Sequence, residues 1–131
     1  MADIERGNRP LSPHLQVYRL PITAYASILT RISGNALIAG AVLLAVWLVG
    51  LAVGGECWEN ANWLATSWLG KLVWLGTIWA LWYHLLGGLR HLIFDAGHGL
   101  ELAQAEQSGW LAIVGSVVLT LLSVGIIWFV I

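Results

Sequence analysis

Three long stretches of the chain hold no charged residue and consist mainly of apolar side chains: residues 32–55, 72–89 and 107–131. They contain 24, 18 and 25 residues, and about 20 apolar residues are needed for an α-helix to cross a bilayer. The pattern therefore predicts an all-α membrane protein with three transmembrane helices. We expect these helices over about 32–53, 63–92 and 109–131. The middle one would start before Lys71, whose ammonium group can reach the membrane surface.

The segments between these stretches are short and polar. Residues 1–20 are expected to form an extended arm, and residues 22–31 a short helix that opens at Pro21, a residue suited to the first turn. Ser33-Gly34 is expected to bend the junction with the first span, and Gly54-Gly55 to end that span. The whole chain, 1–131, is thus predicted to be a single transmembrane domain with a cytoplasmic arm and short helix over 1–31.

The composition agrees with a membrane protein and argues against several kinds of partner and site. The chain is 59% hydrophobic and 10% charged, whereas soluble domains are about 25% charged. A net charge of −1 suggests no nucleic-acid partner. The single cysteine, Cys57, excludes an internal disulfide and a cysteine-based metal or iron–sulfur site within this chain. The loops are too short for a catalytic domain, so chemistry outside the membrane would belong to partner subunits.

The basic residues predict the orientation. Four arginines precede the first span, Arg90 follows the second, and the loop around Cys57 holds no basic residue. By the positive-inside rule, the N-terminus and the loop after Arg90 are cytoplasmic and the C-terminus lies outside. Residues 1–20 show neither a signal-peptide nor a transit-peptide pattern. We therefore expect a multi-pass protein of a bacterial inner membrane, surrounded by lipid.

His84 is the most informative single residue. His84, His91 and His98 are spaced by seven, so on one helix they share a stripe with about 10 Å between neighbours. Only His84 is expected well inside the hydrocarbon, where ionisable groups are costly and usually functional. Its neighbours are small: Gly76, Thr77, Ala80, Gly87 and Gly88. These residues either leave space for a flat haem whose iron His84 binds, or allow close helix packing with His84 hydrogen-bonded across the interface.

The haem alternative has a consequence for assembly. His91 lies on the same stripe as His84 and cannot approach a haem from the opposite side. The first and third spans contain no histidine. A haem with two histidine ligands would therefore take its second ligand from another chain.

Two further groups of polar residues are candidates for the cytoplasmic side. Ser27 and Arg31 are four residues apart and share a helix face. Together they could hydrogen-bond a carbonyl oxygen or stabilise a developing anion; alternatively, Arg31 anchors the helix at the interface and Ser27 is a packing residue. Asp95, Glu101 and Glu106 form either a solvated acidic loop or a proton route, for which Asp95 is the better placed.

The order of these motifs resembles a known family. It comprises Arg9-Pro10-Leu-Ser-Pro-His-Leu-Gln-Val-Tyr18, then Ser27-Ile-Leu-Thr-Arg31, then His84, and then Gly88-Leu-Arg90-His91-Leu-Ile-Phe-Asp95. In a three-span chain of this length, the arrangement is similar to that of the succinate dehydrogenase cytochrome b subunits, the larger membrane anchors of respiratory complex II. The resemblance covers nearly the whole chain.

The resemblance implies roles for the matching residues. His84 would be an axial ligand of haem b, with the other histidine supplied by a smaller anchor subunit. Ser27 and Arg31 would line the ubiquinone pocket, Arg31 would also contact the haem propionates, and Asp95 would lie near the proton route. Some family members carry histidine where this chain has Thr30, so Arg31 is expected to carry more of the propionate contact here.

The resemblance also implies the reaction. A flavoprotein subunit would oxidise succinate, an iron–sulfur subunit would pass the electrons on, and the two anchors would bind the ubiquinone that receives them. This chain alone is not expected to oxidise succinate. One alternative is a fumarate reductase anchor, which runs the same chemistry in reverse; a single candidate haem histidine favours the succinate-oxidising type. The other is a small haem-free channel or structural membrane protein.

Overall fold

The computed structural model describes residues 12–14 and 16–130. This part of the chain folds into four helices and no strand: α1 (Ile22–Val53), α2 (Gly55–Thr66), α3 (Trp68–Asp95) and α4 (Leu102–Val130). Helices α1, α3 and α4 are long and apolar enough to cross a membrane. The expected all-α fold with three spanning helices is confirmed.

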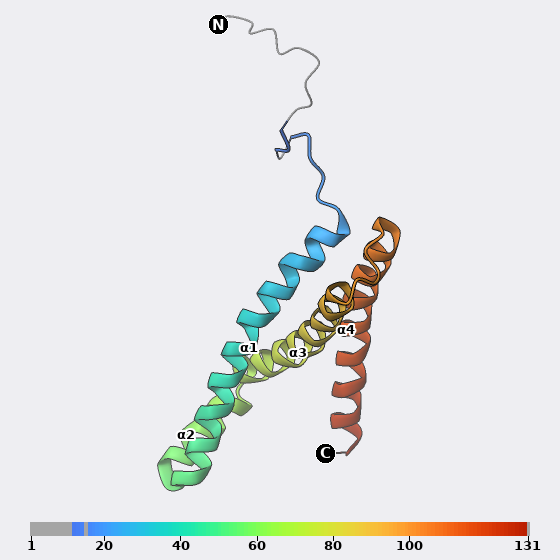
Figure 1. The fold of residues 1–131 in the computed structure, drawn as a ribbon. Coiled ribbons are helices and arrows are strands. Elements are labelled where there is room, and N and C mark those ends of the chain that lie inside the picture. The colour runs from blue at the N-terminus through green and yellow to red at the C-terminus, as the bar shows by residue number, and fades with distance from the viewer. Residues whose placement is uncertain (1–11, 15, 131) are drawn as a thin grey trace, which may run out of the picture.

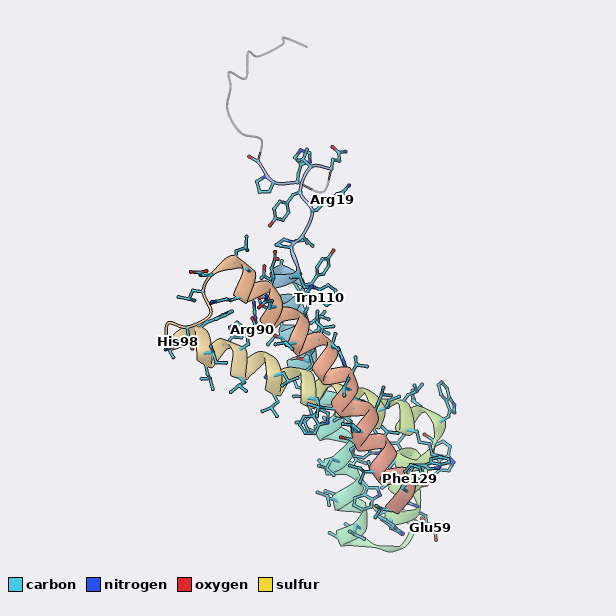
Figure 2. The ribbon with its side chains drawn as sticks, turned by 90° about the vertical axis from the view of Figure 1, so that its right-hand side faces the viewer. Arg19, Glu59, Arg90, His98, Trp110 and Phe129 are labelled. Carbon is cyan, nitrogen blue, oxygen red and sulfur yellow. The ribbon has the colours of Figure 1, made fainter. Side chains whose placement is uncertain are left out.

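The three long helices alternate in direction (Figure 1). Helix α3 packs against both α1 and α4, which also touch each other, while α2 packs against α1 and α3. The start of α1 and the link from α3 to α4 therefore lie at one end of the bundle, and α2 and the end of α4 lie at the other. Figure 2 shows the same division: Arg90 and His98 lie toward one end, and Glu59 and Phe129 toward the other.

Helix α1 is longer than the span expected within it. It begins after Pro21, whose backbone is extended, and runs for 32 residues without a break at Ser33-Gly34. The short leading helix and the first span are thus one helix, and the expected bend does not interrupt it. Ser33 is fully buried and its hydroxyl bonds back to the Thr30 carbonyl, so this small residue serves packing against a neighbouring helix.

The segment between the first two spans is helical too. Gly54 and Gly55 have φ angles of 75° and 56°, a left-handed conformation that glycine adopts without steric cost, and they turn the chain into α2. Trp47 Nε1 donates a hydrogen bond to Asn62 Oδ1 at 3.4 Å, which holds α2 against α1. The Ser67 hydroxyl then accepts the Gly70 N–H at 3.1 Å. This cap lets α3 begin at Trp68, later than the expected start near Trp63.

The helices meet through small side chains. On α1 the buried positions include Ala26, Ser33 and Gly40, spaced by seven, while Ala80 on α3 and Ser116 on α4 are fully buried. Most large apolar side chains point outward instead. Small residues let helix backbones approach closely in a membrane, where lipid offers large apolar side chains no reason to turn inward. The packing is that of a membrane bundle.

The arm is only partly described. Residues 12–14 and 16–20 are exposed, and the Val17 and Tyr18 N–H groups bond the His14 carbonyl. Arg6, Arg9 and Pro10, which contributed to the predicted orientation and to the family resemblance, lie outside the described residues.

Candidate functional site

His84 lies on the exposed side of α3, where α3 meets α1. Its Nδ1 atom is 3.1 Å from the Thr30 carbonyl oxygen and 3.3 Å from the Ser33 hydroxyl. A carbonyl only accepts, so Nδ1 carries the proton in this bond and Nε2 keeps its lone pair. Within the described part of the chain no hydrogen bond engages Nε2. Donating one ring nitrogen to a carbonyl is how metal-binding histidines fix the other nitrogen toward the metal.

The backbone of α1 lies close to the imidazole. A Cβ atom placed on Gly34 would lie 3.1 Å from His84 Cε1. Gly34 therefore permits the ring to rest against α1, and the Thr30 carbonyl holds it there. The imidazole is oriented by α1 although it belongs to α3.

The small residues around His84 divide into two groups. One group packs on α1: a Cβ on Gly87 would come within 2.7 Å of Thr30 Oγ1, and Ala80 is fully buried. The other group, Gly76 and Gly88, faces open space, since an added Cβ would meet no atom of the described residues within 4 Å. Close helix packing and open space beside His84, the two alternatives raised by the sequence, thus apply to different residues. The first group serves helix packing, and the second leaves room beside an exposed His84.

Ser27 and Arg31 occupy successive turns of α1 near its start. Ser27 is half-buried and Arg31 is exposed, and in the described part of the chain neither side chain makes a hydrogen bond. Arg31 directly follows Thr30, the residue whose carbonyl holds His84. Arg31 therefore lies next in sequence to the α1 residue that contacts His84, the candidate iron ligand on α3.

Tyr83 was not singled out by the sequence analysis. Its side chain is 1% exposed, and its hydroxyl donates to the Ala26 carbonyl at 3.0 Å. One signal was present in the sequence: a tyrosine beside the candidate ligand in an apolar span requires a partner for its hydroxyl. Which carbonyl would accept the bond depends on the register of α1 against α3, which no local pattern reveals.

Arg90 has a structural role beyond its contribution to orientation. Its side chain is 8% exposed. Nε donates to the Ser108 hydroxyl at 2.9 Å, Nη2 donates to the Ala105 carbonyl at 3.1 Å, and the guanidinium lies 4.4 Å from the centre of the Phe94 ring. These contacts satisfy a buried charge and join the end of α3 to the start of α4.

The remaining predicted residues lie apart from His84. Helix α3 ends at Asp95, so His98 leaves the stripe. Asp95 is exposed, lies about 16 Å along the helix axis from His84, and forms no ion pair with Arg90. The described residues hold no group of three or more His, Cys, Asp or Glu that could bind a metal together.

The fold defines a class of protein: a small three-span helical membrane protein in which most described residues belong to the bundle. Comparison with known sequences gives the family. Residues 5–123 match the succinate dehydrogenase/fumarate reductase transmembrane subunits. The chain is 57% identical over 130 residues to the succinate dehydrogenase cytochrome b556 subunit of Paracoccus denitrificans, with 99% of each covered.

More distant relatives carry the same kind of name. The cytochrome b556 subunit of Rickettsia felis is 36% identical over 116 residues, which covers 88% of this chain and 90% of the relative. The mitochondrial cytochrome b560 subunit of Sus scrofa is 38% identical over 107 residues, which covers 79% of this chain and 62% of the relative. The chain belongs to the succinate dehydrogenase/fumarate reductase transmembrane subunit family, and the expectation of a cytochrome b membrane anchor subunit of succinate dehydrogenase is confirmed.

Proposed function

We propose that this chain binds haem b through His84 Nε2 and forms part of the ubiquinone-reduction site through Ser27 and Arg31. The observation that carries the haem assignment is the bond from His84 Nδ1 to the Thr30 carbonyl at 3.1 Å. It leaves Nε2 as the free nitrogen of an exposed imidazole next to the open space at Gly88. The relatives' designation as cytochrome b subunits points to the same group.

The haem fits the residues present. His84 would bind the haem iron, and a second histidine would come from another small anchor subunit, since α1 and α4 contain no histidine. Arg31 on the adjacent helix, which is exposed and makes no side-chain hydrogen bond to the described residues, would hold a propionate. Thr30 cannot share that contact as a histidine would, because its hydroxyl bonds the Ala26 carbonyl at 2.9 Å. When bound, the haem supplies a site that accepts and returns single electrons.

Ser27 and Arg31 would act on the quinone directly. The Ser27 hydroxyl would donate a hydrogen bond to a quinone carbonyl and so orient the ring. The Arg31 guanidinium would stabilise the negative charge that develops on the quinone oxygens during reduction, an effect that is strong where water is excluded. Reduction takes up two electrons and two protons, and Asp95 at the end of α3 would lie on the path by which protons arrive.

The rest of the enzyme would supply the electrons. A flavoprotein subunit would oxidise succinate, and an iron–sulfur subunit would carry electrons to the membrane. The quinone site would lie at the cytoplasmic side of a bacterial inner membrane, because the arginines cluster at that end and the positive-inside rule puts the N-terminus there. The C-terminus would then be periplasmic.

Separate assays of the two half-reactions test this proposal. In the intact complex, Ser27→Ala or Arg31→Ala is expected to leave succinate oxidation by a soluble dye largely intact. The rate of ubiquinone reduction is expected to fall about tenfold or more, since each variant lacks a direct or charge-assisted hydrogen bond to the substrate. Ser116→Ala is the matched control for Ser27, because the Ser116 hydroxyl bonds only its own helix. Lys71→Ala is the control for Arg31. Equal loss of both activities would indicate defective assembly and would remove the two residues from the quinone site.

A further inference from the structure

Two neighbouring residues of α3 reach across to α1 and bind two of its backbone carbonyls. The Tyr83 hydroxyl donates to the Ala26 carbonyl at 3.0 Å, and His84 Nδ1 donates to the Thr30 carbonyl at 3.1 Å. Ala26 and Thr30 are four residues apart, one turn of helix. The two bonds therefore attach successive turns of α1 to one point on α3.

The two carbonyls belong to the peptide groups that directly precede Ser27 and Arg31. The Ala26 carbonyl forms the peptide bond with Ser27, and the Thr30 carbonyl forms the peptide bond with Arg31. Because a peptide group is planar, fixing its oxygen fixes the nitrogen and the Cα atom that follow. Tyr83 thus sets the position from which the Ser27 side chain departs, and His84 does the same for Arg31.

Burial determines what Tyr83 can do. Tyr83 is 1% exposed and Ala26 is 2% exposed, so the hydroxyl is closed off from any ligand. The tyrosine ring is held beside Trp79, with 5.6 Å between the ring centres. The Ala26 carbonyl also accepts the Thr30 hydroxyl at 2.9 Å, in addition to its backbone bond within α1. Tyr83 can influence a substrate only through the helix that it holds.

We propose that Tyr83 is a positioning residue for quinone reduction, which holds the peptide group before Ser27 so that the Ser27 hydroxyl meets the quinone carbonyl. The inference rests on the proposed role of Ser27 and Arg31. His84 holds the peptide before Arg31 in the same way. The histidine assigned to the haem therefore contacts the same helix, α1, that carries the two residues assigned to the quinone.

The test is Tyr83→Phe in the complete four-subunit enzyme. This change removes one oxygen atom and keeps the ring in its place. We expect the KM for a soluble ubiquinone analogue to rise about two- to tenfold, the range that loss of one ordinary hydrogen bond produces. Succinate oxidation by a soluble dye and the haem content per complex should stay unchanged. KM is independent of the amount of enzyme, so it can be read even from a poorly assembling variant.

A matched control separates positioning from general loosening of the bundle. Ser123→Ala breaks an α3–α4 bond instead, the one that Trp82 Nε1 makes at 2.9 Å. If Ser123→Ala raises the quinone KM as much as Tyr83→Phe does, the effect belongs to the whole bundle and the proposal is overturned. An unchanged KM in Tyr83→Phe overturns it as well.

The double variant tests whether Tyr83 acts through Ser27. If it does, the KM of Ser27→Ala with Tyr83→Phe will be close to that of Ser27→Ala alone, because the group being positioned is already missing. Effects that multiply would show that Tyr83 does not act through Ser27 and would contradict the proposal. The single variant Ser27→Ala distinguishes failure of the proposed quinone site from failure of the role of Tyr83. If Ser27→Ala leaves the quinone KM unchanged, the proposed quinone site fails. If Ser27→Ala raises the quinone KM and Tyr83→Phe does not, only the role of Tyr83 is overturned.

Discussion

At the residue scale, the proposed haem site depends on His84, an exposed histidine of α3 that is bonded to the backbone of α1. His84 stands out in an apolar span because an imidazole there is costly and needs a reason. Its bond to the Thr30 carbonyl could not be predicted, because it depends on how far α1 is shifted along α3. The same holds for Arg90, which the sequence presents as an orientation signal and the structure buries against Ser108 and Phe94.

The residue-scale prediction concerns His84. His84→Ala removes one axial ligand, and we expect the purified complex to contain less than about a tenth of the normal haem, as the loss of a metal ligand strongly weakens binding. The measurement is the haem-to-protein ratio from the absorption spectrum. His98 is exposed and lies beyond the end of α3. The His98→Ala variant should therefore retain the full haem content. A normal spectrum with full haem content in His84→Ala would exclude His84 as the ligand.

At the scale of elements, the number of long helices could be predicted and their ends could not. A helix must contain about 20 apolar residues to cross the membrane. The three uncharged apolar stretches therefore predicted three spanning helices, as the structure has them. Helix ends follow backbone chemistry instead. Helix α4 begins at Leu102, before the expected position 109, because the polar turn that contains Gln104 and Glu106 is as compatible with helix as the apolar residues after it. Helix α2 depends on the turn at Gly54-Gly55, a pattern that equally suits a plain loop.

The element-scale prediction concerns the contact between α1 and α3. An alanine Cβ at Gly87 would lie 2.7 Å from Thr30 Oγ1, so Thr30 must rotate and lose its bond to Ala26, or the helices must separate. We expect Gly87→Ala to destabilise the complex by about 1–3 kcal/mol, as overpacking usually does. The readout is the temperature at which the complex dissociates on size-exclusion chromatography after heating.

Gly125→Ala is the control for that experiment. Gly125 lies within α4, and a Cβ added there would meet no atom of the described residues within 4 Å. Alanine is about 1 kcal/mol better than glycine inside a helix, so Gly125→Ala should be neutral or slightly stabilising. Equal behaviour of the two variants would mean that α1 and α3 are not as close at Gly87 as described.

At the scale of the whole molecule, the chain leaves most of its membrane surface uncovered. Only 17%, 17% and 11% of the most apolar windows of α1, α3 and α4 are buried within the chain, so lipid and partner subunits must cover the rest. His84 lies on this uncovered surface. That exposure agrees with the inference, drawn from the histidine count, that a second haem ligand comes from another chain.

The orientation can be tested with the only cysteine. Cys57 is exposed at the α2 end of the bundle, which we assign to the periplasm. A thiol reagent that cannot cross membranes should label Cys57 in intact spheroplasts, and Cys57→Ser should abolish the label. With Cys57 replaced, a cysteine introduced by Glu101→Cys should react only in inverted vesicles. Labelling of Glu101→Cys in spheroplasts would reverse the assigned orientation.

An optical spectrum of the complex purified through this chain, recorded before and after succinate is added, tests the proposed haem site and the assembly together. We expect flavoprotein, iron–sulfur and second anchor subunits to copurify, a b-type haem band to be present, and succinate to reduce at least part of it. A complex that contains all four subunits but shows no haem band would contradict the proposal that this chain binds haem b through His84.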